Sequence, residues 1–358
     1  MLSVEKKNLL HSGTVIPAHP LALNAARQLD EEKQRRLTRY YMAAGVGGVA
    51  VAVHTTQFEI RDTQHNLLEP VLRLAAEEVA SANLDRPFLK VAGVIGKTEQ
   101  ALRETELALK YGYDMALVGM AAFKMETEEE VLKHVEEIAK HIPVFGFYLQ
   151  TSIGGRPFSY DFWKAFADIP NVYGIKVAAF NRYQTIDVVR GVCSSSRRDE
   201  IALYTGNDDN IVNDLLTVYR FDIDGQKVEK RFVGGLLGHW AAWTASAVKL
   251  LDDIKEHIAA GYPNASELFT RNIEVTDMNA AIFDPFNSFH GCIAGVHQVL
   301  YQQGLLDGIW CLNPEEDLSP GQLEEIQRVV KAYPHLIDDD FVAQWLIEDQ
   351  KRQVAQTT

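Results

Sequence analysis

The sequence is poor in cysteine and in long uncharged hydrophobic runs. Its three cysteines, Cys193, Cys292 and Cys311, are too few for a disulfide framework and lack the spacing of a zinc site. We therefore expect a protein of the reducing cytoplasm. The N-terminal segment lacks the hydrophobic core of a signal peptide, and no uncharged run has the length needed to span a bilayer. No membrane association is expected.

Positive charge is also scarce. The chain has 35 lysines and arginines against 49 aspartates and glutamates, which gives a net charge of −14. A surface of this sign repels phosphate groups, so we expect no nucleic-acid partner. An anionic substrate would have to be bound locally, by hydroxyls, backbone N–H groups or a few placed cations. Hydrophobic residues make up 47% of the 358 residues, enough to bury a large core.

Short apolar segments alternate with amphipathic helical segments from Gly13 onward. Eight of the apolar segments are rich in Val, Ile, Leu and Phe and apolar on both faces, as buried parallel strands are. They are residues 14–17, 49–53, 88–94, 115–118, 144–148, 172–176, 201–204 and 232–236. Eight such units predict an α/β fold, a (β/α)8 TIM barrel over residues 13–238, preceded by an N-terminal tail of residues 1–12.

The strand pattern stops near Trp240, and helical periodicity follows. The predicted helices are residues 243–257, 266–283, 289–303, 321–332 and 340–353. We expect residues 239–358 to form a helical C-terminal extension packed on the barrel. Its tryptophans, Trp240, Trp243, Trp310 and Trp345, have two interpretations. They provide apolar surface for contacts between subunits, or they dock the helices onto the barrel of the same chain.

Two candidate catalytic residues, Tyr148 and Lys176, each end a predicted strand, and TIM barrels carry their active sites at that end. A lysine at the end of a buried strand is costly unless it loses its charge. A neutral amine attacks carbonyl groups, and a nearby phenol can move the protons that imine chemistry needs. The alternatives are a lysine that extends into solvent and a tyrosine that only fills the core. Thr55 and Thr56 follow another strand and reach the same rim.

Tyr148 ends the strand that precedes the one ended by Lys176, and Lys176 closes the tripeptide Gly-Ile-Lys. Together with Thr55 and Thr56, this pattern resembles that of the dihydrodipicolinate synthase / N-acetylneuraminate lyase family. The members of this family are class I pyruvate-type aldolases. The tripeptide alone is weak evidence, but the tyrosine at the matching offset and the threonine pair make the resemblance specific. The resemblance extends over about residues 13–248, roughly two thirds of the chain. It implies that the chain is a divergent member of the family.

The resemblance implies a function and an assembly. Lys176 would form an imine with pyruvate or another 2-oxo acid, Tyr148 would shuttle protons, and Thr55 and Thr56 would hold the carboxylate. The protonated imine is the electron sink, so no metal or organic cofactor is expected. The family tends to form oligomers, which implies a homodimer or homotetramer.

Three further residues are candidates for binding substrate. Asn181 matches a polar residue of the family pattern, and a backbone carbonyl near Gly235 could meet the substrate because glycine permits close approach. Arg156 could replace the substrate-binding arginine of the synthases, whose place is taken by Ile153. A solvated loop arginine is the alternative interpretation of Arg156.

Other positions depart from the family pattern. His54 and Gln57 flank the threonine pair where the family usually has glycines, and Phe180 replaces a small residue. Residues 119–123 lack the paired tyrosines that extend the proton relay of the synthases. We therefore predict a Schiff-base lyase, an aldolase or a dehydratase/hydratase, whose second reactant is not the amino-acid aldehyde of the synthases. Sugar-derived acids and aromatic pyruvate adducts remain open. The alternative is a non-catalytic, ligand-binding or regulatory relative.

Overall fold

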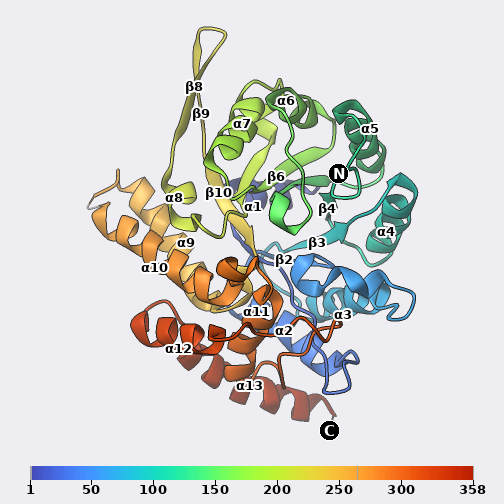
Figure 1. Cartoon of the computed structure of the whole chain (residues 1–358), viewed down its shortest axis with the longest axis vertical. Coiled ribbons are helices and arrows are strands. Elements are labelled where there is room, and N and C mark those ends of the chain that lie inside the picture. The colour runs from blue at the N-terminus through green and yellow to red at the C-terminus, as the bar shows by residue number, and fades with distance from the viewer. Residues whose placement is uncertain (1, 264, 358) are drawn as a thin grey trace.

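The computed structural model, which describes residues 2–263 and 265–357, confirms the predicted barrel (Figure 1). Eight parallel strands form one sheet in the order β1-β10-β7-β6-β5-β4-β3-β2. They are β1 (Val15–Pro17), β2 (Gly48–Val51), β3 (Leu89–Val94), β4 (Met115–Gly119), β5 (Val144–Leu149), β6 (Val172–Ala178), β7 (Ala202–Thr205) and β10 (Phe232–Leu237). A parallel bridge between Ala18 and Ala50, with a 2.8 Å hydrogen bond from the His19 N–H to the Ala50 carbonyl, joins β1 to β2 and closes the ring.

Seven helices alternate with the strands and surround the sheet (Figure 1). They are α2 (Glu31–Ala43), α3 (Leu68–Ser81), α4 (Thr98–Lys110), α5 (Glu128–Ala139), α6 (Tyr160–Asp168), α7 (Arg182–Cys193) and α8 (Ile211–Leu216). In α5, a capping box between Thr127 and Glu130 starts the helix, and Val131, Val135 and Ile138 form its buried stripe. Among the described residues, no helix is both long and apolar enough to cross a bilayer.

The segment predicted as a tail, residues 1–12, contains a helix, α1 (Val4–Ser12), at the amino end of the barrel. Leu10 of this helix is buried among the side chains of the barrel interior. The Tyr204 hydroxyl, which comes from β7, donates a 3.0 Å hydrogen bond to the Leu10 carbonyl. Because α1 covers the amino end, a ligand would enter the barrel from the carboxyl end.

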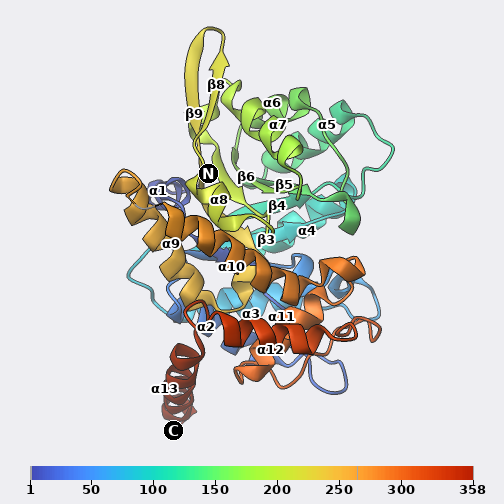
Figure 2. The same cartoon turned by 60° about the vertical axis from the view of Figure 1, so that its left-hand side comes forward.

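The sequence prediction missed a hairpin between α8 and β10. Its antiparallel strands, β8 (Tyr219–Ile223) and β9 (Gln226–Lys230), project from the barrel in both views (Figures 1 and 2). The turn is the dipeptide Asp224-Gly225, with both residues at positive φ, and the Gly225 N–H donates to the Asp222 carboxylate. An Asp-Gly pair between two strand-like runs is a strong hairpin signal, so the sequence contained the information.

The C-terminal extension is helical, as predicted, and packs on one side of the barrel (Figure 2). Its helices are α9 (Thr244–Ala259), α10 (Ser266–Phe283), α11 (Cys292–Gln302), α12 (Gln322–Ala332) and α13 (Asp339–Thr357). Trp240, Trp243 and Trp345 are buried within the chain, and Trp310 is half-buried. The first three therefore dock the extension onto the barrel and offer no surface to a second subunit. The oligomeric state stays a prediction.

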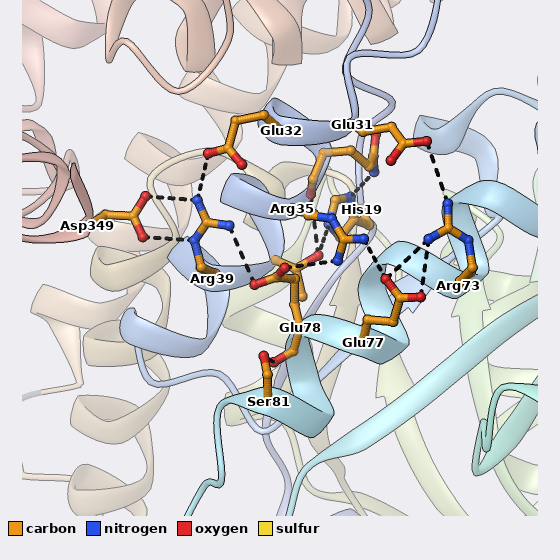
Figure 3. A network of polar contacts seen from close by, with 12 residues as sticks. His19, Glu31, Glu32, Arg35, Arg39, Arg73, Glu77, Glu78, Ser81 and Asp349 are labelled. Carbon is orange, nitrogen blue, oxygen red and sulfur yellow. Dashed lines mark hydrogen bonds and ion pairs between the residues drawn. The ribbon is translucent and has the colours of Figure 1, made fainter. Parts of the chain in front are cut away.

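A network of ion pairs holds α13 against α2 and α3 (Figure 3). The Arg39 guanidinium of α2 donates from Nε and Nη2 to the two carboxylate oxygens of Asp349, at 2.8 and 3.0 Å. The same guanidinium contacts Glu32 and Glu78. The Asp349 side chain is only 5% exposed, so this pair is shielded from solvent.

Replacing Asp349 with alanine is expected to lower the free energy of unfolding by about 2 kcal/mol, because a buried, bidentate, charge-assisted contact is lost. Glu348→Ala is the matched control, since Glu348 is exposed and pairs with Arg352 of the same helix. That variant should change stability by less than about 0.5 kcal/mol. Urea denaturation followed by tryptophan fluorescence measures both values, and equal losses would contradict the role given to Asp349.

Candidate active site

Strand side chains alternate between the barrel interior and the surrounding helices, and this alternation places Lys176 inside. Phe145, Phe147 and Leu149 of β5 belong to the cluster of interior side chains. Phe147 pairs with Lys176 in the register of β5 and β6. The Lys176 Nζ lies 4.4 Å from the centre of the Phe147 ring. Lys176 therefore projects into the barrel near its carboxyl end.

A cavity of about 50 Å³ adjoins Lys176 and is called here the lysine pocket. A water molecule needs about 10–15 Å³ on this measure, so a small acid of a few heavy atoms is the size of ligand that suits it. The polar residues of its wall, besides Lys176, are His54, Thr55, Gln150, Asp208 and Cys292. Within residues 2–263 and 265–357, no group of His, Cys, Asp and Glu side chains has the arrangement of a metal site.

Lys176 and Asp208 are the two ionisable side chains of the pocket whose charges interact most directly. Burial lowers the pKa of Lys176 to about 8, and the negative charge of Asp208 opposes that shift. Burial raises the pKa of Asp208 to about 7, and the positive charge of Lys176 opposes that shift. No hydrogen bond joins the two groups in the described part of the chain, and both line the lysine pocket. Near neutral pH the pair can supply a neutral amine and exchange protons.

Asp208 was not among the site residues predicted from the sequence. It follows β7 in the segment Thr205-Gly-Asn-Asp208, and its Oδ1 accepts a 3.1 Å hydrogen bond from the His239 N–H. Gly206 is required beside it, because a Cβ there would approach the Lys176 Cε to 2.6 Å. An acidic residue just beyond a barrel strand was the available signal. The neighbouring aspartate, Asp209, is exposed.

Thr55 and Thr56 lie in the 3₁₀ turn η1 (His54–Thr56) that follows β2, and only Thr55 lines the lysine pocket. The Thr55 hydroxyl donates to the Ala18 carbonyl at 2.7 Å, and the Thr56 hydroxyl donates to the His19 carbonyl at 2.6 Å. Both hydroxyl protons therefore serve to join the ends of β1 and β2. The contact of these hydroxyls with a substrate carboxylate stays a prediction.

Tyr148 does not line the lysine pocket. Its ring faces α6, where it lies 5.0 Å from the ring of Trp163. A register shift in the β5–β6 ladder explains this position. Val144 pairs with Val172, but Phe145 pairs with Gly174, so the ladder skips Tyr173 and Phe147 stands opposite Lys176 in place of Tyr148. The role of Tyr148 in proton transfer stays a prediction that this geometry does not support.

Asn181, Gly235 and Arg156 also lie outside the walls of the lysine pocket. The Asn181 side chain caps α7 by accepting the N–H of Gln184. Gly235 is packed beneath an indole, since a Cβ there would meet the ring of Trp240 at 2.5 Å. Arg156 donates from Nη1 to two backbone carbonyls of the loop between β4 and α5. Each of the three has a local structural role, and their predicted contacts with substrate remain untested.

The C-terminal extension completes the lysine pocket. Phe283 at the end of α10, Phe289 before α11 and Cys292 at the start of α11 all line it. The ring of Phe180, which replaces a small residue of the family pattern, contacts Phe289 edge-on at 5.9 Å between centroids. The extension is thus part of the candidate site and does more than cover the barrel.

Comparisons with known proteins agree with this architecture. The model of the dihydrodipicolinate synthetase family matches residues 11–218. A 4-hydroxy-tetrahydrodipicolinate synthase from Syntrophobacter fumaroxidans is 31% identical over 188 residues, which are 51% of this chain and 60% of that protein. An N-acetylneuraminate lyase from Citrobacter koseri is 24% identical over 205 residues, which are 56% of this chain and 65% of that protein. The alignments thus span about three fifths of the curated relatives.

Solved structures extend the likeness over most of the chain. A prophage protein of the dihydrodipicolinic acid synthase family from E. coli K12, solved in complex with pyruvate, has a TM-score of 0.70 at 17% identity and covers 89% of this chain and 98% of that chain. Dihydrodipicolinate synthase from Oceanobacillus iheyensis has a TM-score of 0.71 at 15% identity, with 92% and 98% covered. At these identities the likeness shows the fold.

Proposed function

We propose that this chain, which belongs to the dihydrodipicolinate synthetase family, is a lyase that acts on pyruvate or another 2-oxo acid through an imine on Lys176. The observation that carries the proposal is the environment of Lys176. Its amine is buried inside the barrel at the carboxyl end of β6, where burial lowers its pKa to about 8. Such an amine is neutral often enough near pH 7 to attack a ketone.

The chemistry begins with attack of the Lys176 amine on the ketone carbon, followed by loss of water to give a protonated imine. Removal of a proton from the neighbouring methyl or methylene carbon then gives an enamine, with the imine nitrogen as electron sink. The enamine forms a carbon–carbon bond with an aldehyde, and the reverse sequence cleaves that bond. These steps need no metal or organic cofactor, because the imine itself withdraws the electrons.

We assign the proton transfer to Asp208. Its carboxylate is buried in the same pocket as Lys176, and burial raises its pKa to about 7, close to the value that suits a general base at neutral pH. Tyr148 was the predicted proton carrier, but its ring lies on the other face of β5.

The substrate carboxylate would lie against the first N–H groups of η1. The backbone N–H groups of His54 and Thr55 donate to no acceptor in the described ranges, and both residues line the lysine pocket. Unpaired N–H groups at the start of a helical turn suit an anion. His54 adds no charge there, because burial and the nearby Lys176 lower its pKa to about 4.

Exchange of the pyruvate methyl protons in D₂O tests this proposal without knowledge of the second substrate. The protein is expected to replace the methyl protons with deuterium, which proton NMR follows as loss of the methyl signal. Exchange requires the imine and the enamine. A protein that forms the imine but does not catalyse exchange would favour the alternative, a ligand-binding relative without turnover.

The rate of imine formation at low pyruvate concentration is expected to rise with pH and to level off above about pH 8, because the Lys176 amine must be neutral to attack. In the Asp208→Asn variant, the rising part of this pH profile should move to lower pH. The negative charge of Asp208 favours the ammonium form of Lys176, so its removal lowers the pKa of the amine further. Borohydride quenching at timed intervals measures the rate. An unshifted profile would show that Asp208 does not influence Lys176.

A further inference from the structure

A second cavity, of about 210 Å³, lies beside the lysine pocket at the carboxyl ends of β2 to β5. Val53, Phe147 and Leu149 line both cavities. The two cavities are therefore at most one side chain apart. The ring of Phe147, which the Lys176 amine approaches, forms part of their shared wall.

The wall of the second cavity is apolar. It is formed chiefly by Phe58, Ile95, Leu117, Met120, Ala121 and Ala122. No charged side chain of the described residues lines it, and its polar side chain, Gln100, donates its amide to Glu104 at 2.9 Å. The carbonyls of Ala52 and Gly93, which also belong to the wall, accept hydrogen bonds from Arg61 at 3.1 and 3.0 Å. These three polar groups of the wall are thus already engaged.

We propose that this cavity binds the ring-sized apolar substituent of the second reactant, an aromatic aldehyde. The inference rests on the proposed function of Lys176 and names the substrate class of the same site. The lysine pocket holds the ionisable groups that a 2-oxo acid requires, whereas the described residues that line the adjoining cavity include no charged side chain and one polar side chain, Gln100. A polyhydroxylated or charged substituent would lose its hydration there and find too few polar partners to replace it.

The volume of the second cavity is large enough for a single substituted aromatic ring. An apolar cavity of about 150 Å³ is enough to bind benzene, and this cavity is somewhat larger. The lack of a side chain at Gly119 helps to keep this space free. A Cβ at that position would lie only 3.1 Å from the Ile95 Cγ2. Small side chains at Ala121 and Ala122 keep the wall back in the same region.

The proposed step balances without an oxidant or reductant. The enamine carbon of pyruvate bonds to the aldehyde carbon, and the electron pair of the aldehyde C=O moves to its oxygen. That oxygen takes the proton that Asp208 removed from the pyruvate methyl group. Water then hydrolyses the imine, which releases a 4-hydroxy-2-oxo acid with an aryl group at C4 and restores the Lys176 amine. The reverse direction cleaves that acid to pyruvate and the aldehyde.

The test compares benzaldehyde with glyceraldehyde as partners of pyruvate. The readout is the ratio of the two kcat/KM values, which cancels effects that are common to both aldehydes. Ile95→Asp places a carboxylate in the apolar wall, and Ala121→Phe fills the cavity. Each variant is expected to lower the ratio at least about tenfold. Leu109→Asp is the control, since Leu109 is exposed on α4 and away from both cavities. It should leave the ratio unchanged.

A binding measurement separates this inference from the proposed function. Benzyl alcohol is titrated into the wild type and the two cavity variants, and NMR line broadening reports binding without turnover. If pyruvate exchanges its protons but the aldehyde ratio does not respond to the variants, the cavity assignment is wrong. If pyruvate does not exchange and the variants weaken benzyl alcohol binding, the lyase proposal fails while the apolar site stands. If pyruvate does not exchange and the variants leave benzyl alcohol binding unchanged, both proposals fail.

Discussion

Replacing Lys176 with methionine is expected to lower the rate of pyruvate proton exchange by about 10⁴-fold or more, because every chemical step proceeds through its amine. Methionine keeps an unbranched stem of similar length against Phe147 and removes only the nucleophile and its charge. The variant should fold, since loss of a buried amine removes a desolvation cost.

Lys90→Met is the matched control for this variant. Lys90 is also a lysine of a barrel strand, β3, and burial lowers its pKa as well. Its amine, however, donates to the Tyr111 carbonyl in the loop that leads into β4, at the amino end of the barrel. Exchange by Lys90→Met should remain within about twofold of the wild type. A large loss there, or retained exchange in Lys176→Met, would place the reacting amine elsewhere.

Asp208→Asn is expected to slow pyruvate exchange by about 10²- to 10⁴-fold while leaving imine formation intact. Asparagine can still accept the hydrogen bond from the His239 N–H, so the local structure should persist, but its amide cannot take a proton from carbon. Single-turnover borohydride trapping measures imine formation, and NMR measures exchange. A parallel loss of both would indicate a structural role for Asp208.

Two further variants sharpen the assignment of the proton carrier. Asp209→Asn tests the neighbouring exposed carboxylate and should change exchange by less than about threefold. Tyr148→Phe should also have a small effect, because the phenol faces Trp163 and not the lysine pocket. If Tyr148→Phe were severe and Asp208→Asn mild, the sequence-based role of Tyr148 would be right and the assignment to Asp208 wrong.

The barrel was predictable because the strand signal is strong and local. Each strand is short, apolar on both faces and followed by an amphipathic helix, so period and length alone identify the eight units. The position of α10 was predicted to the residue, since its apolar spacing continues up to Phe283. The hairpin of β8 and β9 was missed because its strands are partly exposed and mix apolar with polar residues, so they lack the continuous apolar run by which the barrel strands were identified.

The site was harder to predict because its geometry depends on register. The sequence spacing places Tyr148 beside Lys176 only if the β5–β6 ladder is regular, and the shift in that ladder brings Phe147 there instead. Asp208 and the aromatic residues Phe283 and Phe289 come from loops and helix ends whose approach to the barrel depends on tertiary packing. Sequence spacing alone does not specify such contacts.

Borohydride trapping of the pyruvate imine tests the central claim most directly. The protein is mixed with pyruvate, reduced, digested and mapped by peptide mass spectrometry, with a parallel sample that lacks pyruvate. We expect one added mass of reduced pyruvate, located on the peptide that contains Lys176, and none in the Lys176→Met variant. Absence of an adduct, or an adduct on another lysine such as Lys90, would contradict the assignment of Lys176 as the reacting amine.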